Sequence, residues 1–498
     1  MFQLKGSDVL KERYRSFSEL ILKPFIRSSP GAAGCSKRER NKKGRNNSFI
    51  FVVPDAKGMK ATPIEEVYAV FKASSGITTD SRCVTPNVLF WALRGERFDG
   101  NSFARQALDK GAYAAVVDNP EVAASDERCI YVENTEIALG QLAAFHRKQF
   151  AIDVLLITGT NGKTTTKELC HAVLRTRYKV LATEGNLNNQ IGLPLTLLKL
   201  NETHQVAVIE AGASHPGDIR YLTEIAAPTL GIITNIGRAH LEGFGSYEGV
   251  IRTKTELYDY LRLHDGRVLL NSSDPLLVAQ AKGLTAYRYA LSPETDTLWG
   301  EAIPTGLFLE LVWHWENSAY SLKTKLVGAY NLPNVMAAIA LGLRKGIDPD
   351  QINQAIERYE PHNNRSELRA ETERRNRLVI DAYNANPSSM KAALDSFFAL
   401  STAQPRVLIL GDMLELGSKS EEEHAAVLEQ LAGRKEAFTL YAVGSCFGAL
   451  KKKYGKPFYF FDTTEMLREA LQQHPITGSL VLIKGSHGIG LQTLLDVL

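Results

Sequence analysis

Residues 154–169, with the sequence VLLITGTNGKTTTKEL, contain the side chains best suited to chemistry. The apolar run 154–157 is short enough for a buried strand, and a glycine turn then opens on Lys163 and a helical pattern. A strand, turn and helix of this kind form a phosphate cradle, because backbone N–H groups and the positive helix end face the anion. There Lys163 reaches the β- and γ-phosphates of a nucleotide, and the Thr164 hydroxyl can bind Mg²⁺. An ordinary strand–helix turn is the alternative interpretation.

The loop is shorter than the general phosphate-binding pattern G-x-x-x-x-G-K-[ST], because Ile157 occupies the position of the first glycine. The chain instead carries G-T-N-G-K-T-T over residues 159–165. This shortened form is informative about which nucleotide-binding family the chain resembles.

Three further side chains follow the apolar strands of the same region. Glu210 ends a strand, where an acid can hold Mg²⁺ or its water for phosphoryl transfer, or can cap the next helix. His240 lies just past another strand end and is either a ligand or a hydrogen-bonded structural residue. Lys254 lies in a helical segment, where a solvated face is the usual explanation. Its carbamylation by CO₂ into an anionic metal ligand is an alternative that the residue pattern alone does not indicate.

Asn331 and Asn334 open a helix expected over residues 333–343. Asparagine at a helix start is most often a cap. Two amides one turn apart can also read the donor and acceptor edge of adenine. Both interpretations stay open on the sequence.

A second group of polar side chains follows the strands in the last third of the chain. Asp381 ends one strand and is followed by Tyr383, Asn384 and Asn386, while Lys484 ends another. Open parallel sheets bind ligands at the carboxyl ends of their strands. We therefore expect a cleft between this region and the nucleotide site.

The elements that must position these residues alternate between strand and helix. After a helix over 62–71, capped by Thr62, a small α/β module contains a strand at 114–118 and a helix at 137–149. This alternation, interrupted by a β-rich stretch at 307–328, predicts mostly parallel sheets covered on both faces. The later strands are expected at residues 154–158, 206–210, 230–234, 267–271, 377–383, 406–412, 439–444 and 479–485.

Length and composition are those of a globular protein of several domains. At 498 residues the chain is too long for one core, and two to four domains are expected. It has no run of eighteen apolar residues, so we expect no membrane span. The five cysteines are scattered and lack any CxxC pairing, which favours a reducing cytoplasm over a disulfide framework or a zinc site.

The net charge of +3 hides an asymmetry between the first 58 residues and the rest. Residues 1–58 hold thirteen Lys and Arg against five Asp and Glu, and residues 28–48 have no periodicity that could bury a face. We expect a basic, disordered extension or a misassigned start, with Met59 as the natural first residue. The remaining chain is acidic, so charge gives no support for nucleic-acid binding by the main body.

Seven segments together resemble the Mur ligases. They are GTNGKTTTKEL, GNLNNQIGLPLTLL (185–198), VIEAGASHPGDI (208–219), AHLEGFGS (239–246), VIDAYNANPSSM (379–390), LGDMLELG (410–417) and IKGSHGI (483–489). Within the family they are most similar to members that add D-alanyl-D-alanine to UDP-N-acetylmuramoyl-tripeptide (UDP-MurNAc-tripeptide). The Asp-Asn-Pro-Arg motif of the diaminopimelate- or lysine-adding members is absent. The resemblance covers residue 60 to the end and leaves residues 1–58 outside.

The resemblance implies an α/β fold of three domains. A small N-terminal α/β domain (59–152) would hold the UDP-sugar end of the substrate. A central ATPase with a mostly parallel sheet (153–360) would follow, and a C-terminal Rossmann-like domain (361–498) would close over it. The implied cofactors are ATP and Mg²⁺, and the implied partners are small-molecule substrates handled by a cytoplasmic monomer, without nucleic acid or a membrane span.

The resemblance also assigns roles to individual residues. ATP would contact Gly159, Thr160, Asn161, Gly162, Lys163, Thr164, Thr165, Asn331, Asn334 and Arg365. Mg²⁺ would lie among Thr164, Glu210, His240 and a carbamylated Lys254. The catalytic set is Lys163, Lys254, His240 and Asp381. The substrates would meet Ser81, Arg82, Asn188, Asn189, Tyr383, Asn384, Asn386 and Lys484. Tyr330 departs from the family, which usually has histidine before the first adenine-side asparagine.

Three rival functions remain on the sequence. A sibling ligase would use a different amino acid or substrate, and an amine screen separates it. A nucleotide-dependent switch protein would release phosphate without regard to any amine. A nucleic-acid binder would depend on the basic residues 1–58.

Overall fold

The computed structural model describes residues 58–498, except for residues 294–295, 304–305, 362–366 and 370–371. The chain divides into two compact units: one runs to Gln149 and includes Leu197–Lys199, and the other contains the remainder from Phe150. The predicted basic extension therefore lies outside the described residues except for Gly58. Within the part of the chain described, no helix is both long and apolar enough to cross a membrane.

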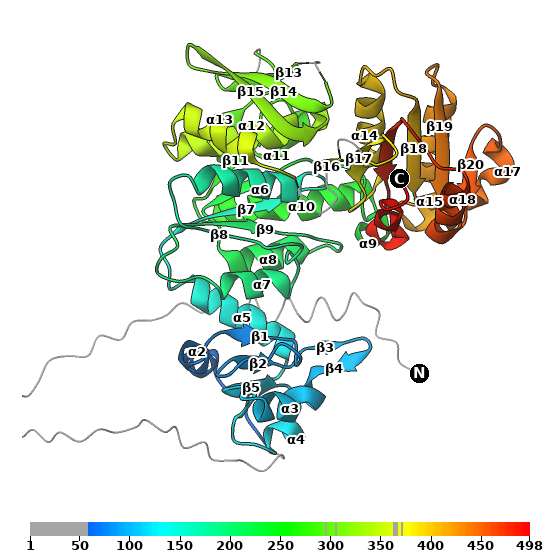
Figure 1. Ribbon diagram of the computed structural model, residues 1–498. Helices are drawn as coiled ribbons and strands as arrows, with labels where there is room; N and C mark the ends of the chain where they lie inside the picture. Colours follow the sequence, from blue (N-terminus) through cyan, green and yellow to red (C-terminus); the bar gives the residue numbers. More distant parts are fainter. Residues whose placement is uncertain (1–57, 294–295, 304–305, 362–366, 370–371) are drawn as a thin grey trace, which may run out of the picture. The chain divides into compact units, whose positions relative to one another are not determined.

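The first unit is built on a four-stranded parallel sheet with the order β1-β2-β5-β6. Strands β1, β2 and β5 are labelled in Figure 1. The central strands β2 and β5 are fully buried, which agrees with their continuous apolar sequence. Its strands are β1 (Ile77–Thr78), β2 (Leu89–Trp91), β5 (Ala114–Val117) and β6 (Cys129–Tyr131), with a hairpin of β3 (Arg94–Gly95) and β4 (Phe98–Asp99). Its helices are α2 (Ile64–Ala73), α3 (Ala104–Asp109), α4 (Pro120–Ala123) and α5 (Thr135–Arg147).

The predicted cap of the first helix is wrong. Helix α2 begins at Ile64, its N-cap is Pro63, and no side chain caps it. The Thr62 N–H donates to the carbonyl of Tyr131 on β6 (2.8 Å), so Thr62 extends the sheet edge rather than the helix. A long-range backbone contact thus overrides the local capping pattern.

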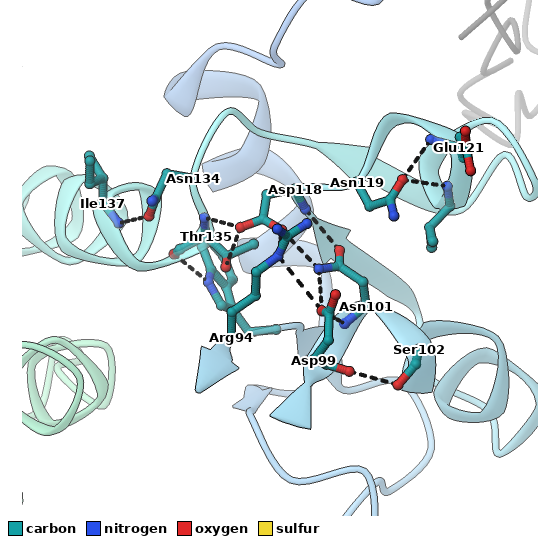
Figure 2. Close-up of polar contacts among 12 residues, drawn as sticks. Arg94, Asp99, Asn101, Ser102, Asp118, Asn119, Glu121, Asn134, Thr135 and Ile137 are labelled. Carbon is teal, nitrogen blue, oxygen red and sulfur yellow. Dashed lines mark hydrogen bonds and ion pairs between the residues drawn. The ribbon is translucent and has the colours of Figure 1, made fainter. Parts of the chain in front are cut away.

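A polar network ties the β3–β4 hairpin to the sheet (Figure 2). The Asn101 amide donates to Asp99 (2.7 Å) and Asp118 (2.8 Å), and the Arg94 guanidinium pairs with Asp118 at 2.8 Å. Asp118 also accepts from the N–H and the hydroxyl of Thr135, at the start of α5. One carboxylate therefore fixes the hairpin, the end of β5 and the first turn of α5 together.

The second unit contains a six-stranded parallel sheet with the order β12-β11-β10-β7-β9-β8. The chain passes from β7 to β8 and β9 on one side and to β10–β12 on the other, so the strand order reverses at β7. Its strands are β7 (Asp153–Thr158), β8 (Val180–Ala182), β9 (Val206–Glu210), β10 (Leu230–Ile233), β11 (Arg267–Asn271) and β12 (Thr285–Tyr289). The strands expected at 154–158, 206–210, 230–234 and 267–271 are confirmed to within a residue.

The helices of this region bury much of their surface against the sheet. Almost every residue of α12 from Leu332 to Gly342 is buried, and it packs with α6 in one hydrophobic core. The helices are α6 (Lys163–Leu174), α7 (Gly192–Leu197), α8 (Asp218–Ala226), α9 (Leu241–Phe244), α10 (Tyr247–Leu263), α11 (Pro275–Gln280), α12 (Leu332–Arg344) and α13 (Pro349–Arg358). The β-rich stretch expected at 307–328 is confirmed as β14 (Phe308–Trp315) and β15 (Ser318–Val327). An additional strand, β13 (Trp299–Ile303), completes this antiparallel three-stranded sheet.

A second six-stranded sheet, with the order β16-β17-β21-β18-β19-β20, forms the last part of the chain. All of its pairings are parallel except that of β16 with β17. Its strands are β16 (Glu367–Arg369), β17 (Arg377–Asp381), β18 (Arg406–Gly411), β19 (Phe438–Val443), β20 (Tyr459–Phe461) and β21 (Leu480–Lys484). Its helices are α14 (Pro387–Ala399), α15 (Ser420–Ala432), α16 (Ser445–Ala449), α17 (Lys451–Tyr454) and α18 (Thr464–Gln473). The predicted α/β class is confirmed.

Candidate functional site

A cavity of about 780 Å³ opens at the carboxyl end of β7, where the strand order reverses. Ligands bind at this position in open parallel sheets. The walls come from the phosphate loop, the segments after β8, β9 and β10, the start of α12, and the carboxyl ends of β17 and β21. The cavity brings together fifteen of the predicted site residues: Thr160, Asn161, Gly162, Lys163, Thr165, Asn188, Asn189, Glu210, His240, Asn331, Asn334, Asp381, Tyr383, Asn384 and Lys484.

Two glycines of the phosphate loop have no room for a side chain. Gly159 has φ +139°, and a Cβ there would lie 2.1 Å from the Thr234 hydroxyl. Gly162 has φ +79°, and its Cβ would lie 2.4 Å from Oδ1 of Asn334. Left-handed backbone and close packing both require glycine at these positions. The loop conformation is therefore encoded by these two residues.

The segment after β10 fixes the loop from the other side. The Thr160 N–H donates to the Asn235 carbonyl (2.9 Å), and the Asn161 N–H donates to the Asn235 side chain (3.1 Å). The Thr160 hydroxyl accepts from the Gly237 N–H at 2.9 Å. Asn235 and Gly237 are positioning residues that the sequence interpretation missed. Their position directly after a central strand was the available signal.

Lys163 and Thr164 begin α6 at the loop. The Lys163 ammonium donates to the carbonyls of Gly159 (2.9 Å) and Thr160 (3.0 Å). The buried Thr164 hydroxyl donates to one oxygen of Glu210 (2.9 Å). The lysine thus lies along the loop that would hold the phosphates, and the threonine lies against the predicted acid.

Glu210 is buried at the carboxyl end of β9. Its two oxygens accept from the Thr164 hydroxyl and, at 2.8 Å, from the Asn188 amide. A hydroxyl and a carboxylate together are hard oxygen ligands of the kind that Mg²⁺ prefers. The donor set therefore fits the predicted magnesium ion.

His240 has a left-handed backbone (φ +49°) and forms the N-cap position of α9. Its Nδ1 contacts a carboxylate oxygen of Glu415, which follows β18 in the last sheet. The hydrogen bond from His240 lowers the pKa of Glu415. Glu415 also lines the cavity, and the sequence interpretation did not single it out.

Lys254 lies on α10 and is buried, with only 2% of its surface exposed. Burial lowers its pKa to about 7, and the positive charge of Lys163 lowers it further, against the opposing effect of Asp218 and Glu256. Its ammonium lies 5.5 Å from the ring centre of Phe244. Lys254 is therefore not on a solvated face, and at neutral pH a large fraction of its amine is unprotonated.

Asn331 and Asn334 do not cap α12 with their side chains. The Asn331 amide donates to the Val327 carbonyl (2.9 Å), and its oxygen accepts from the Asn334 amide (3.0 Å). Asn334 in turn accepts from the Thr166 hydroxyl on α6 (3.1 Å). The two amides therefore join the start of α12 to the helix of the phosphate loop.

The carboxyl ends of β17 and β21 form the opposite wall. Asp381 and Lys484 are neighbours in the strand register, and their side chains form an ion pair at 2.6 Å. The Lys484 side chain is 1% exposed and that of Asp381 is 18% exposed. Lys484 also donates to the Asn384 carbonyl at 3.3 Å. The pair gives this wall one fixed positive and one fixed negative group.

Asn386 and Asn189 act as helix caps. The Asn386 oxygen accepts from the Ser389 N–H at the start of α14, and its amide donates to Oδ1 of Asn161 (2.8 Å). Asn189 accepts from the Gly192 N–H at the start of α7 (2.9 Å). Asn386 therefore contacts the phosphate loop without lining the cavity.

The remaining predicted residues lie elsewhere. Ser81 and Arg82 belong to the first unit, where Arg82 is exposed and forms a bidentate ion pair with Asp80 (2.7 Å). Arg365 lies outside the described residues. The roles of these three residues therefore stay predictions from the sequence.

Asp412, His424 and Cys446 form the one group among the described residues that has the spacing of a metal site. Asp412 accepts from the N–H groups of Cys446 (2.8 Å) and Phe447 (2.9 Å), which caps α16. His424 Nε2 accepts from the Met413 N–H (3.0 Å), and burial lowers the pKa of its imidazole. The ligand atoms are engaged in hydrogen bonds, so this group stabilises the loop after β18.

Comparison with known proteins gives three family matches: Mur ligase family, catalytic domain (residues 74–147), Mur ligase middle domain (157–342), and Mur ligase, glutamate ligase domain (364–487). The chain is 35% identical to the UDP-N-acetylmuramoyl-tripeptide--D-alanyl-D-alanine ligase of Bacillus subtilis (strain 168), over 88% of this chain and 94% of the relative.

Two solved structures share the fold. MurF from Acinetobacter baumannii matches with a TM-score of 0.75 and 31% identity, over 86% of this chain and 97% of that one. MurF ligase from Thermotoga maritima in complex with ADP matches with a TM-score of 0.76 and 25% identity, over 85% and 97%. These matches confirm the three-domain fold expected from the motifs.

Proposed function

The chain belongs to the Mur ligase family, and from this premise we propose that it uses ATP to join D-alanyl-D-alanine to UDP-MurNAc-tripeptide in peptidoglycan synthesis. The single observation that carries the proposal is the cavity at β7. It combines a phosphate loop with the Asp381–Lys484 pair of a second sheet. Its substrates are small molecules, and we place the reaction in the cytoplasm.

The reaction needs ATP because a carboxylate is a poor electrophile. In the first step a carboxylate oxygen of the tripeptide attacks the γ-phosphorus, which forms an acyl phosphate and releases ADP. In the second step the amine of D-alanyl-D-alanine attacks the acyl carbon and forms a tetrahedral intermediate. Loss of inorganic phosphate and of the amine proton then leaves the new amide.

The phosphate loop aligns the transferring group. Phosphoryl transfer depends mainly on positioning and on charge stabilisation. The N–H groups of Thr160 and Asn161 are already bonded to Asn235, so those of residues 162–165 would bind the phosphates. The Lys163 ammonium would leave the carbonyls of Gly159 and Thr160 to neutralise the γ-phosphoryl charge. Asn331 and Asn334 line the same pocket, and we propose that they contact the adenine.

Mg²⁺ would be held by Thr164, Glu210, His240 and Lys254. When bound, the ion supplies positive charge that screens the phosphate oxygens. For Lys254 we propose carbamylation: the neutral amine attacks CO₂, a C–N bond forms, and one proton is released. Its burial and its pKa of about 7 support this step, because the neutral amine is the reactive form.

The second sheet protects the acyl phosphate from water. Asp381 and Lys484 line the cavity opposite the loop, and Asn386 contacts Asn161 of the loop directly. We propose that residues 361–498 close over residues 153–360 and bring the Asp381–Lys484 pair into the site only then. Tyr383, Asn384, Asn188 and Asn189 would contact the substrates there, while residues 59–152, with Ser81 and Arg82, hold the UDP-sugar.

The decisive experiment is an amine screen. Purified protein receives ATP, Mg²⁺ and UDP-MurNAc-tripeptide with D-alanyl-D-alanine or with single amino acids. Phosphate release and the mass of the product are measured. We expect pentapeptide and stoichiometric phosphate only with the dipeptide, and Lys163→Ala should abolish both.

The rival functions give different results in the same assay. A sibling ligase would prefer another amine, and a nucleotide-dependent switch would release phosphate equally well without any amine. A chain lacking residues 1–58 should keep full ligase activity, and a loss of activity there would favour a role for the basic segment. The absence of pentapeptide under all conditions would refute the proposal.

A further inference from the structure

Glu415 links the second sheet to the nucleotide site, and its role there is inferred from the function proposed above. Glu415 follows β18, whereas its partner His240 follows β10 in the other sheet. Both side chains line the cavity that contains the phosphate loop and Glu210. The contact of His240 with Glu415 therefore joins the two sheets at the predicted site of chemistry.

The loop that carries Glu415 is anchored before it reaches His240. The Met413 N–H donates to His424 (3.0 Å), and the Leu414 N–H donates to the Ser486 hydroxyl (3.0 Å). Glu415 itself has a left-handed backbone with φ +63°, which costs free energy for a residue with a side chain. The surrounding hydrogen bonds hold this conformation and direct the carboxylate to one place.

The segment that carries His240 is equally constrained. Gly237 forms two hydrogen bonds with Thr160 of the phosphate loop, and the Ile236 carbonyl accepts from the Tyr247 hydroxyl (3.1 Å). The His240 ring packs edge-on against Phe244, with 6.2 Å between ring centres. Gly237, three positions before His240, therefore contacts the phosphate loop.

Neighbouring contacts join the segment that carries His240 to helices α14 and α15. The Arg238 N–H donates to the Ser388 hydroxyl (3.2 Å), and its guanidinium lies 3.5 Å from the carboxylate of Glu423 on α15. The segment 237–240 therefore meets the last part of the chain at three residues, Ser388, Glu415 and Glu423. Only the contact of His240 with Glu415 involves a side chain of the predicted metal site.

We propose that Glu415 is a positioning residue for His240 and that it couples domain closure to the assembly of the nucleotide site. Its carboxylate lies against Nδ1 of the imidazole. A proton kept on Nδ1 by this neighbour would set the tautomer and leave Nε2 as the ring nitrogen that acts as a ligand. Carboxylate partners of this kind orient metal-binding histidines in many proteins. When the second sheet is withdrawn, His240 loses this partner, so ATP is activated only in the closed form.

The first test reads the His240 tautomer in metal-free protein without any substrate. Protein labelled with ¹⁵N-histidine is compared with Glu415→Ala and Glu415→Gln at about pH 8.5, where imidazole is neutral. The His240 signals are assigned from their loss in His240→Gln. We expect the Nδ1–H form in the wild type and in Glu415→Gln, whose amide oxygen still accepts, and a shift toward Nε2–H in Glu415→Ala. An unchanged tautomer in Glu415→Ala would overturn the proposal.

The second test measures turnover. Glu415→Ala should lower kcat and weaken Mn²⁺ binding about 10–100-fold, with less change in the KM for ATP and with Glu415→Gln largely restored. Glu421→Ala is the matched control, because Glu421 is an exposed acid on the neighbouring helix α15. The double variant His240→Ala/Glu415→Ala should be no slower than His240→Ala alone, and additive losses would refute the coupling. If the wild type makes no pentapeptide, the proposed function fails, but the tautomer test still decides the role of Glu415.

Discussion

Replacement of Lys254 tests the chemistry proposed for the nucleotide site most directly. The side chain is 2% exposed, and burial is the largest cause of its lowered pKa. Lys254→Ala removes the amine that would react with CO₂, and with it the negative charge of the carbamate. We expect kcat to fall about 10²–10³-fold, the size of effect found when one preorganised charge-stabilising group is removed.

The magnitude of the CO₂ dependence follows from the pKa. With a pKa of about 7, about half of the Lys254 amine is neutral at pH 7, against roughly one part in three thousand for an ordinary lysine at 10.5. The carbamate should therefore form readily at pH 7–8. Below pH 7 the amine is protonated, so activity should fall there and should recover in part when bicarbonate is added.

Replacement of Lys254 should raise the stability of the fold at low pH, although it lowers activity. The pKa of Lys254 is lower in the folded state than in the unfolded state, so the buried group destabilises the fold. This destabilisation is complete below pH 7 and absent above pH 10.5. The penalty is at most about 5 kcal/mol at pH 6. Lys254→Met keeps the apolar stem without the charge, so it should unfold at a higher denaturant concentration than the wild type at pH 6, with the difference shrinking toward pH 10.

The assays are initial rates of phosphate release in CO₂-depleted and bicarbonate-containing buffer, together with ¹³C NMR of protein equilibrated with labelled bicarbonate. Acetate or another short-chain acid should restore part of the activity of Lys254→Ala by replacing the lost carboxylate. A Lys254→Ala enzyme as fast as the wild type, with no response to bicarbonate or to added acids, would refute the reasoning.

Three further predictions follow from single contacts. Asp381→Ala leaves the Lys484 ammonium buried without its carboxylate partner, so the free energy of unfolding from denaturant titrations should fall by about 3 kcal/mol. Pentapeptide synthesis should also be lost, and normal turnover would refute the role of Asp381 in closure. Gly162 has a left-handed backbone, and Gly162→Ala places a Cβ 2.4 Å from the Asn334 amide oxygen. ATP binding measured by calorimetry should therefore weaken at least tenfold. Unchanged affinity would contradict the close packing. Asn386→Ala removes the cap of α14, so the melting temperature should fall by an amount equivalent to about 1 kcal/mol. It also removes the contact with the phosphate loop, so kcat should fall by a larger factor than the KM for ATP rises. Equal changes in kcat and KM would contradict a role in closure.

Local patterns were sufficient to predict most of the architecture. Buried parallel strands are continuous apolar runs, which is why β7, β9 and β11 were located to within a residue. The phosphate loop was also readable, because the positive φ of Gly159 and Gly162 is accessible mainly to glycine. The short edge strands β8, β12, β16 and β20 were missed, because their conformation depends on a neighbouring strand rather than on their own sequence.

The sequence by itself determined the α/β rhythm, the phosphate loop and the family of the chain, because each depends on residues that are close together in the sequence. The tertiary structure alone decided which distant side chains meet. Asp381 and Lys484 are 103 positions apart and pair only because β21 inserts beside β17. The burial that lowers the pKa of Lys254 and the contact of Glu415 with His240 likewise arise from packing between elements, and no local pattern records that packing.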